Sequence, residues 1–90
     1  MDYREYYTKS AELDLEKIGE FEATKITQKI NYYIGTKNPM KFAKKLTNCK
    51  IDTYRFRVGS FRIIFRIDKN GKIIILVILK IAHRKDVYKS

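Results

Sequence analysis

The spacing of apolar residues changes from a helical period in the first half of the chain to a strand period in the second. Between residues 11 and 34 the apolar side chains recur every three or four positions, which predicts two amphipathic helices. Thr8 or Ser10 can cap the first helix, and a glycine follows each helical segment. This pattern predicts a helical hairpin, and the loose alternation over residues 3–7 predicts a short strand before it.

From residue 53 onwards, apolar residues alternate with polar ones, as in a half-buried strand. Aromatic and β-branched side chains alternate with arginines over residues 54–58 and 61–67. Gly59-Ser60 lies between these segments and suits a two-residue hairpin turn, and Asn70-Gly71 favours a second one. The pattern therefore predicts two consecutive β-hairpins.

The last predicted strand, residues 72–81, is apolar on both faces, which is typical of a central strand covered on both sides. Before the strands, Asn38-Pro39 can open a short helix that runs through Phe42 to Leu46. Helices followed by an antiparallel meander predict an α+β fold, in which a helical hairpin packs on a small antiparallel sheet. Ninety residues are too few for two hydrophobic cores, so we expect one domain over residues 1–90.

The net charge is strongly positive and unevenly distributed. The chain has 20 Lys and Arg residues against 10 Asp and Glu, which gives a formal charge of +10. Residues 1–35 carry five basic and seven acidic side chains, whereas residues 36–90 carry fifteen basic and three acidic ones. A one-sided excess of this size attracts polyanions. It favours a nucleic acid as the partner, and the alternative is a solvated lysine-rich surface without a ligand.

Composition disfavours several classes of protein. No apolar run approaches the roughly 20 residues that span a bilayer, and the first residues lack the apolar region of a signal peptide. The single cysteine, Cys49, permits no internal disulfide and suits a reducing compartment. We therefore expect a cytoplasmic protein without membrane association. One histidine and no cysteine pair also predict that the chain holds no metal, and with no glycine-rich phosphate loop we expect no other cofactor.

Three arginines are predicted to share one face of the first hairpin. With a two-residue turn between the strands, Arg57 lies directly opposite Arg62, and Arg55 lies opposite Ile64, one diagonal step away. Like charges directly opposite each other destabilise a strand pair, so we expect an external anion to complete the site. Guanidinium groups bind phosphate oxygens in a bidentate geometry, which makes an RNA backbone a natural ligand. The alternative is an ordinary solvated sheet face with screened charges.

The last strand is followed by the only histidine of the chain and by further cations. Residues 82–88 read Ala-His-Arg-Lys-Asp-Val-Tyr. Histidine titrates near neutral pH, whereas arginine does not, and tyrosine supplies a hydroxyl and a stacking ring. This segment can therefore bring His83, Arg84 and Tyr88 to the end of the sheet. A lone histidine is more commonly a packing or surface residue, so a catalytic role depends on these neighbours.

Three stretches of the sequence resemble the RelE/ParE toxin superfamily. Residues 8–18 are similar to the family's first helix, residues 54–67 to its central hairpin and residues 83–88 to its terminal motif. The resemblance implies a compact domain with a microbial-ribonuclease-like sheet and a helical hairpin. It also implies an acidic, RelB-like antitoxin as the partner. RelE-like members cleave mRNA in the ribosomal A site without a metal, by attack of the 2′-hydroxyl on the adjacent phosphate.

The resemblance also implies roles for individual residues. Arg62 matches the hairpin arginine that holds the scissile phosphate, and Arg84 matches an arginine near the leaving group. Tyr88 matches a tyrosine that stacks on or orients the substrate base. Arg55 and Arg57 match two basic residues of the RelE site. Further cations that we expect to bind the RNA are Lys44, Lys45 and Lys85.

One departure from the RelE pattern affects proton transfer. RelE members have lysines at the positions of Arg55 and Arg57, and a lysine can lose its proton where an arginine cannot. His83 is therefore the candidate general base, while the arginines bind phosphate and stabilise the charge of the transition state. Two other functions are open: a ParE-like inhibitor of DNA gyrase that cuts nothing, and a nucleic-acid-binding module without enzymatic activity. We expect the free protein to be a monomer.

Overall fold

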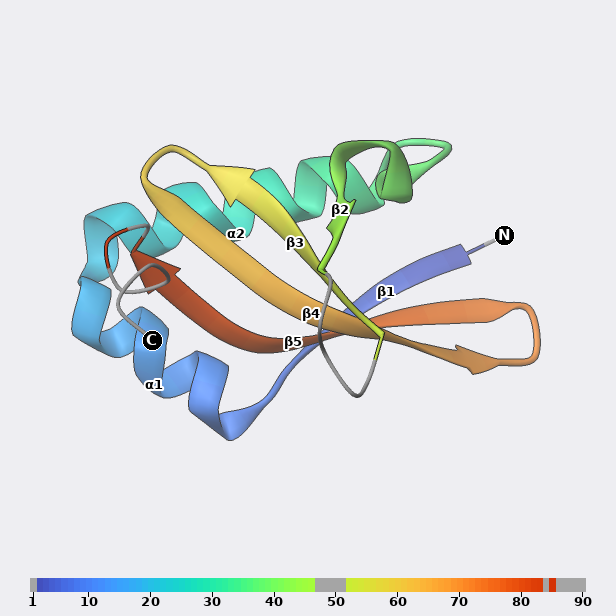
Figure 1. Cartoon of the computed structure of the whole chain (residues 1–90), viewed down its shortest axis with the longest axis horizontal. Coiled ribbons are helices and arrows are strands. Elements are labelled where there is room, and N and C mark those ends of the chain that lie inside the picture. The colour runs from blue at the N-terminus through green and yellow to red at the C-terminus, as the bar shows by residue number, and fades with distance from the viewer. Residues whose placement is uncertain (1, 47–51, 84, 86–90) are drawn as a thin grey trace.

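The computed structural model describes residues 2–46, 52–83 and 85. A five-stranded sheet with strand order β1-β5-β4-β3-β2 is combined with a helical hairpin (Figure 1), which confirms the predicted α+β class. The elements are β1 (Asp2–Tyr7), α1 (Lys9–Ile18), α2 (Glu20–Ile34), the 3₁₀ helix η1 (Pro39–Phe42), β2 (Lys44–Lys45), β3 (Thr53–Val58), β4 (Phe61–Asn70) and β5 (Ile73–His83). Within the described ranges, no helix has the length and apolar content needed to cross a membrane.

The helical hairpin forms as the apolar spacing predicts. The side chain of Thr8 accepts the N–H of Ala11 at 3.2 Å and thereby caps α1. Gly19 joins the two helices with a φ of 101°, a conformation that glycine tolerates because it has no Cβ. In α2, Ile26 and Ile30 are fully buried, and Figure 1 shows α2 crossing one side of the sheet. We name this side the helix-covered face and the opposite side the open face.

The sheet is mixed, whereas the sequence predicted an antiparallel one. Strands β3, β4 and β5 form the expected antiparallel meander, but β1 runs parallel to β5 at one edge of the sheet. Strand β5 is therefore central, as its two apolar faces indicated. Two parallel strands need a long crossover connection between them. The helical hairpin of α1 and α2 forms part of the connection between β1 and β5.

The helix predicted over residues 38–46 ends at Phe42. The ring of Phe42 stacks on that of Tyr33 in α2, with 4.6 Å between the ring centroids. Ala43 is already extended, and Lys44–Lys45 pair with β3 as the short edge strand β2. The prediction was wrong beyond Phe42 because pairing with an available sheet edge outweighs even a favourable helix propensity.

Both hairpin turns are present, and the second lies one residue later than predicted. Gly59 and Ser60 form the first turn, with Gly59 at a φ of 58°. In the second hairpin Asn70 still belongs to β4, so the turn residues are Gly71 and Lys72. Each turn begins with a glycine in the left-handed region, which glycine adopts without a steric cost.

A β-bulge in β5 reverses the alternation of side chains near one end of the sheet. Residues 64 and 65 of β4 pair with Lys80 and Ile78, so Leu79 is an extra residue without a partner on β4. Before the bulge the even-numbered residues of β5 lie on the helix-covered face, and after it the odd-numbered ones do. Ile81 accordingly packs in the core, whereas Lys80 lies on the open face.

The side chains of Asp14 in α1 and of Thr8, its N-cap, hold this bulge in place. The hydroxyl of Thr8 donates to the carbonyl of Ile78 at 2.9 Å and lies 3.4 Å from that of Leu79. The carboxylate of Asp14 accepts the N–H of Ile81 at 3.0 Å. Because the pairing of β1 with β5 ends at Ile78, α1 supplies the hydrogen-bond partners that a neighbouring strand would otherwise give to this edge.

The core lies between the helices and the helix-covered face of the sheet. Phe56 and Phe65 are fully buried, and their rings stack with 4.6 Å between the centroids. Tyr54 stacks on Phe65 at 5.8 Å and packs on the core. Burial, reinforced by the charge of Glu5, raises the pKa of Tyr7 to about 12. The aromatic side of β3 thus faces inward, which leaves its arginines on the open face.

Candidate nucleic-acid interface

Positive side chains gather on the open face, on adjacent strands. Arg57 and Arg62 are directly opposite each other and Arg55 is opposite Ile64, which confirms the register predicted from the two-residue turn. On the other side of β3, Lys44 of β2 is opposite Arg55. Residues that pair across neighbouring strands form a row of the sheet. The like-charged pairs Lys44–Arg55 and Arg57–Arg62 therefore lie in consecutive rows of the same face. This arrangement is unfavourable without a counter-charge.

Lys80 joins this group because of the bulge in β5. It pairs with Ile64 from the side opposite to β3, so it extends the row that contains Arg55. We name the positive residues of the two rows the cation face, and they are Lys44, Arg55, Arg57, Arg62 and Lys80. Strict alternation along β5 would have put Lys80 on the helix-covered face, so the sequence pattern did not indicate its place here.

Arg62 is the buried member of the cation face. Only 5% of its surface is exposed, and its Nη1 is buried and has no hydrogen-bond partner among the described residues. An unsatisfied buried donor costs roughly 1–3 kcal/mol, and more when the group is charged. A phosphate oxygen would supply the missing acceptor and the opposite charge together. The unsatisfied Nη1 makes Arg62 a candidate anion-binding residue, and an anion reaches this atom only when the groups that cover it move.

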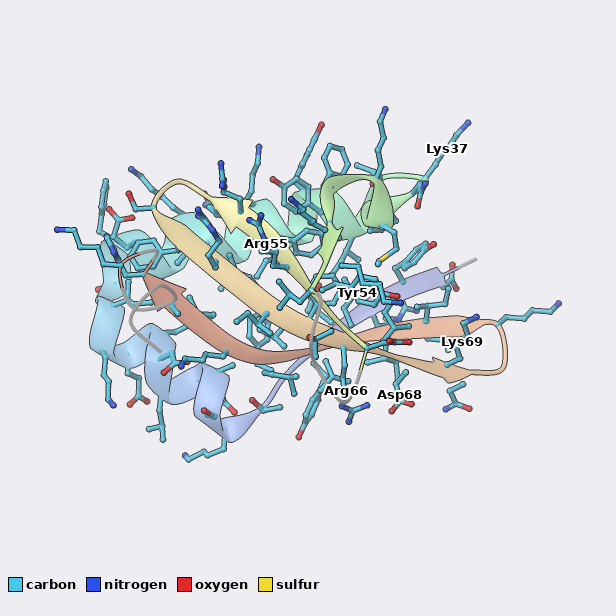
Figure 2. The ribbon with its side chains drawn as sticks, viewed as in Figure 1. Lys37, Tyr54, Arg55, Arg66, Asp68 and Lys69 are labelled. Carbon is cyan, nitrogen blue, oxygen red and sulfur yellow. The ribbon has the colours of Figure 1, made fainter. Side chains whose placement is uncertain are left out.

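In the part of the chain that the structure describes, no carboxylate forms an ion pair with the cation face. The ion pairs found there join Lys45 to Asp52 at 3.4 Å and Arg66 to Asp68 at 3.5 Å. Figure 2 shows Arg55 well apart from the Arg66–Asp68 pair. No ion pair among the described residues therefore neutralises the positive charge of this face.

The three lysines predicted to bind RNA lie in different places. Lys44 belongs to the cation face, opposite Arg55. Lys45 pairs with Tyr54, whose ring packs on the core. Lys85 is exposed and follows the end of β5. Three residues singled out in the sequence lie outside the described residues, and they are Cys49, Arg84 and Tyr88.

The structure does not bring His83 together with the arginines. His83 is opposite Phe61 at the end of β5, and the two rings meet edge-on with 5.4 Å between the centroids. Because Phe61 packs on the core, His83 points toward the helix-covered face, where the bulge has shifted the odd-numbered residues. Its Nδ1 accepts the N–H of Lys85 at 3.2 Å. This hydrogen bond occupies the acceptor position at Nδ1.

The open face also carries an exposed aromatic ring, Tyr6 of β1. It pairs with Val77, which pairs with Arg66 on the other side, and 60% of its surface is exposed. Exposed rings on a sheet can stack on nucleobases. Neither Tyr6 nor Arg66 stood out in the sequence, because the parallel pairing that brings them into one row has no local signal.

The chemistry open to the cation face is phosphate binding and stabilisation of negative charge. Its arginines stay protonated and cannot act as bases. Preorganised cations can stabilise the charge that develops on a phosphate during nucleophilic attack. Among the residues placed by the structure, no three possible metal ligands from His, Cys, Asp and Glu come together.

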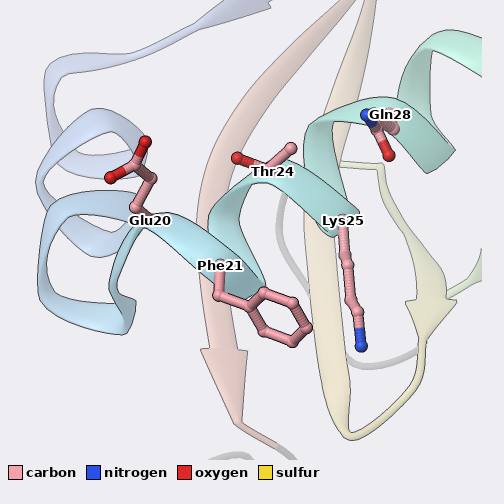
Figure 3. Close-up of a pocket in the computed structure, with 5 residues that line it drawn as sticks. All are labelled: Glu20, Phe21, Thr24, Lys25 and Gln28. Atoms are coloured by element: carbon pink, nitrogen blue, oxygen red, sulfur yellow. The ribbon is translucent and has the colours of Figure 1, made fainter.

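A pocket on α2 is separate from the cation face. Glu20, Phe21, Thr24, Lys25 and Gln28 line it (Figure 3). The ring of Phe21 is 70% exposed, and the ammonium of Lys25 lies 4.4 Å from its centroid. This pocket offers one cation beside an aromatic ring and shares no residue with the cation face.

A known protein family matches most of the sequence. The profile of the ParE toxin of type II toxin–antitoxin systems, parDE, matches residues 6–88. No curated protein matches the sequence significantly.

Similar solved structures contain toxins together with their antitoxins. The RelBE2 toxin–antitoxin complex of Mycobacterium tuberculosis matches with a TM-score of 0.70 and 22% identity, over 93% of this chain and 100% of that chain. The archaeal RelE–RelB complex of Pyrococcus horikoshii has a TM-score of 0.65 and 25% identity, over 93% and 97% of the two chains. The RelB–RelE complex of Methanococcus jannaschii has a TM-score of 0.52 and 28% identity, over 92% and 94%. These likenesses confirm a RelE-like fold.

Proposed function

The chain belongs to the ParE toxin family of type II toxin–antitoxin systems, within the RelE/ParE superfamily, and we propose that it is an endoribonuclease that cleaves mRNA on the ribosome. The observation that carries this proposal is Arg62, which is buried with an unpaired Nη1 and stands opposite Arg57. Such a group is costly unless an anion completes it. A phosphate of the RNA backbone would do so.

In the proposed reaction Arg62 binds the scissile phosphate. The 2′-hydroxyl of the preceding nucleotide attacks the phosphorus, the bond to the 5′-oxygen of the following nucleotide breaks, and a cyclic phosphate remains. Arg55 and Arg57 stabilise the negative charge that develops on the phosphate oxygens. Arg84 near the leaving group and Tyr88 against the substrate base stay predictions from the family resemblance.

Proton removal from the 2′-hydroxyl is the step predicted for His83. For His83 to accept this proton, the hydrogen bond between its Nδ1 and the N–H of Lys85 has to break and the ring has to turn past the end of β5. This rearrangement raises the free energy needed for His83 to act, whereas Arg55, Arg57 and Arg62 already lie together on the cation face. We therefore expect the arginines to contribute more to the rate than His83 does.

A RelB-like antitoxin is the proposed partner. The similar toxins from Pyrococcus horikoshii and Methanococcus jannaschii were solved in complex with RelB. The formal charge of +10 favours an acidic partner, because complementary charge speeds association and suppresses wrong pairings. We expect this complex to form in the cytoplasm and to silence the toxin.

A second candidate function is inhibition of DNA gyrase without cleavage. The matching profile is that of a ParE toxin, and His83, the candidate base, lies on the helix-covered face, away from the arginines of the cation face. In that case the cation face would bind an anionic surface and would need no base.

A reconstituted translation reaction and a gyrase supercoiling assay separate the two functions. We expect the protein to cut mRNA only during translation, to leave a cyclic phosphate, and to leave supercoiling unchanged. Arg62→Ala should lower the cleavage rate by about 100-fold or more, and His83→Gln by less than about tenfold. Lys25→Ala on α2 is the matched control and should keep full activity.

Each outcome of these assays has a definite consequence. Inhibited supercoiling without any mRNA cleavage would exclude the nuclease. A loss of about 100-fold in His83→Gln would instead identify His83 as the base. Unchanged cleavage in Arg62→Ala would remove Arg62 from the reaction.

A further inference from the structure

We propose that Lys80 binds the phosphate next to the one held by Arg62, so that two successive phosphates of the RNA strand are gripped across β4 and β5. This inference rests on the proposed RNA-cleaving function and adds a residue that the family resemblance did not indicate. It starts from the bulge at Leu79, which places Lys80 on the open face opposite Ile64.

Lys80 and Arg62 are diagonal neighbours on this face. Arg62 pairs with Ala82, and Lys80 stands two residues before Ala82 on β5. Diagonal neighbours of this kind are about 7–8 Å apart, and both side chains are long enough to close or widen that gap. The two cations can therefore contact adjacent phosphates without a change in the backbone.

The surroundings of Lys80 leave its charge available. The residues between the two cations are apolar, namely Ala82, which is 5% exposed, and Ile64, which is partly exposed. The carboxylate of Asp14 lies near the next residue of β5, but it accepts the backbone N–H of Ile81. Among the described residues no ion pair involves Lys80, whose side chain is exposed.

The bulge is what distinguishes Lys80 from an ordinary surface lysine. Two side chains, Thr8 before α1 and Asp14 within it, form hydrogen bonds with the backbone on either side of Leu79. Bulges are frequent next to functional sites, where they redirect a side chain. Here the redirected side chain is a lysine that extends the row of Lys44 and Arg55 across the sheet.

Binding of a 2′-O-methyl RNA oligonucleotide, which cannot be cleaved by 2′-hydroxyl attack, tests this contact. Affinity is measured by fluorescence anisotropy over a range of salt concentrations. Lys80→Gln should weaken binding by about three- to tenfold and reduce the slope of log K against log salt by about 0.7, the share of one phosphate contact with a single strand. Lys80→Arg keeps the charge and should keep both values.

The matched control is Lys69→Gln. Lys69 is exposed on β4 near the second hairpin turn (Figure 2), opposite Ile74 and away from the cation face. It should leave affinity and slope unchanged. An unchanged slope in Lys80→Gln, or an equal change in both variants, would overturn the assignment of Lys80.

The outcome for Lys80 is distinguishable from the outcome for the nuclease. If the parent protein cuts translated mRNA but Lys80→Gln keeps the salt dependence, the Lys80 contact is refuted and the nuclease stands. If RNA binding depends on Lys80 but no mRNA is cut, the nuclease is refuted and the contact stands. If the parent protein does not bind the oligonucleotide, the contact is refuted whatever the cleavage assay shows.

Discussion

The substitution Arg62→Met tests whether Arg62 is retained for an anion rather than for the fold. Methionine keeps a long, unbranched side chain that can fill the same space, but it removes the charge and the donors. If Arg62 is a binding residue, the variant should be more stable than the parent protein and should lose RNA cleavage. A residue that serves the fold would show the opposite change in stability.

The expected gain in stability has two parts. Arg62 is 5% exposed and its Nη1 has no partner, so removing it relieves roughly 1–3 kcal/mol of unsatisfied donor. It also ends the repulsion from Arg57 directly opposite, which contributes up to about 1 kcal/mol. Allowing for imperfect packing of the new side chain, we expect the free energy of unfolding to rise by about 1–3 kcal/mol. In a domain of this size that is a Tm increase of at least about 4 °C.

Urea denaturation followed by circular dichroism, in a buffer without phosphate or sulfate, measures this change. The matched control is Arg57→Met, because Arg57 is exposed and opposite the same residue. It removes the same repulsion without removing a buried donor, so its stability should change by less than about 1 kcal/mol. Inorganic phosphate at ten times its Kd should then stabilise the parent protein by about 1.4 kcal/mol and leave Arg62→Met unaffected.

A decrease in the stability of Arg62→Met by more than about 1 kcal/mol would refute the reasoning. Such a loss would mean that the protein itself satisfies the buried guanidinium. The anion-binding argument for the cation face would then lose the observation on which it depends.

Two further predictions concern the fold around the site. Asp14→Ala should lower the free energy of unfolding by about 1–2 kcal/mol, because the N–H of Ile81 loses its acceptor. Asp14→Asn keeps an oxygen and should lose less stability in urea denaturation. Equal losses in the two variants would contradict this role of Asp14. The pKa of Tyr7 is about 12 in the folded protein against an ordinary value of 10, so its contribution to stability is complete below pH 10 and is lost as the pH rises toward 12. The stability of Tyr7→Phe, measured over the same pH range, should fall less steeply than that of the parent protein, and parallel curves would contradict the assignment.

Much of the fold could be predicted because its signals are local. Apolar spacing predicted both helices, Thr8 was among the expected caps, and glycine turns marked both hairpins. Strand β2 and the parallel pairing of β1 were missed, since each depends on a distant partner strand rather than on neighbouring residues. The short helix was extended too far for the same reason.

The same distinction between local and long-range signals applies to the candidate site. A two-residue turn determines which residues face each other, so the sequence alone predicted that Arg57 stands opposite Arg62. The burial of Arg62 and the unpaired state of its Nη1 could not be predicted, because both depend on how the whole sheet packs.

The amino-acid sequence by itself determined the helical hairpin, the antiparallel meander and the shared face of the three arginines, because spacing and turn chemistry act over a few residues. Only the tertiary structure decided that Lys80 joins those arginines and that His83 faces the other way. The physical reason is the extra residue Leu79, held by hydrogen bonds from Thr8 and Asp14, which are more than sixty positions away along the chain. That bulge reverses the alternation of β5 after Ile78, and no pattern within the strand itself indicates it.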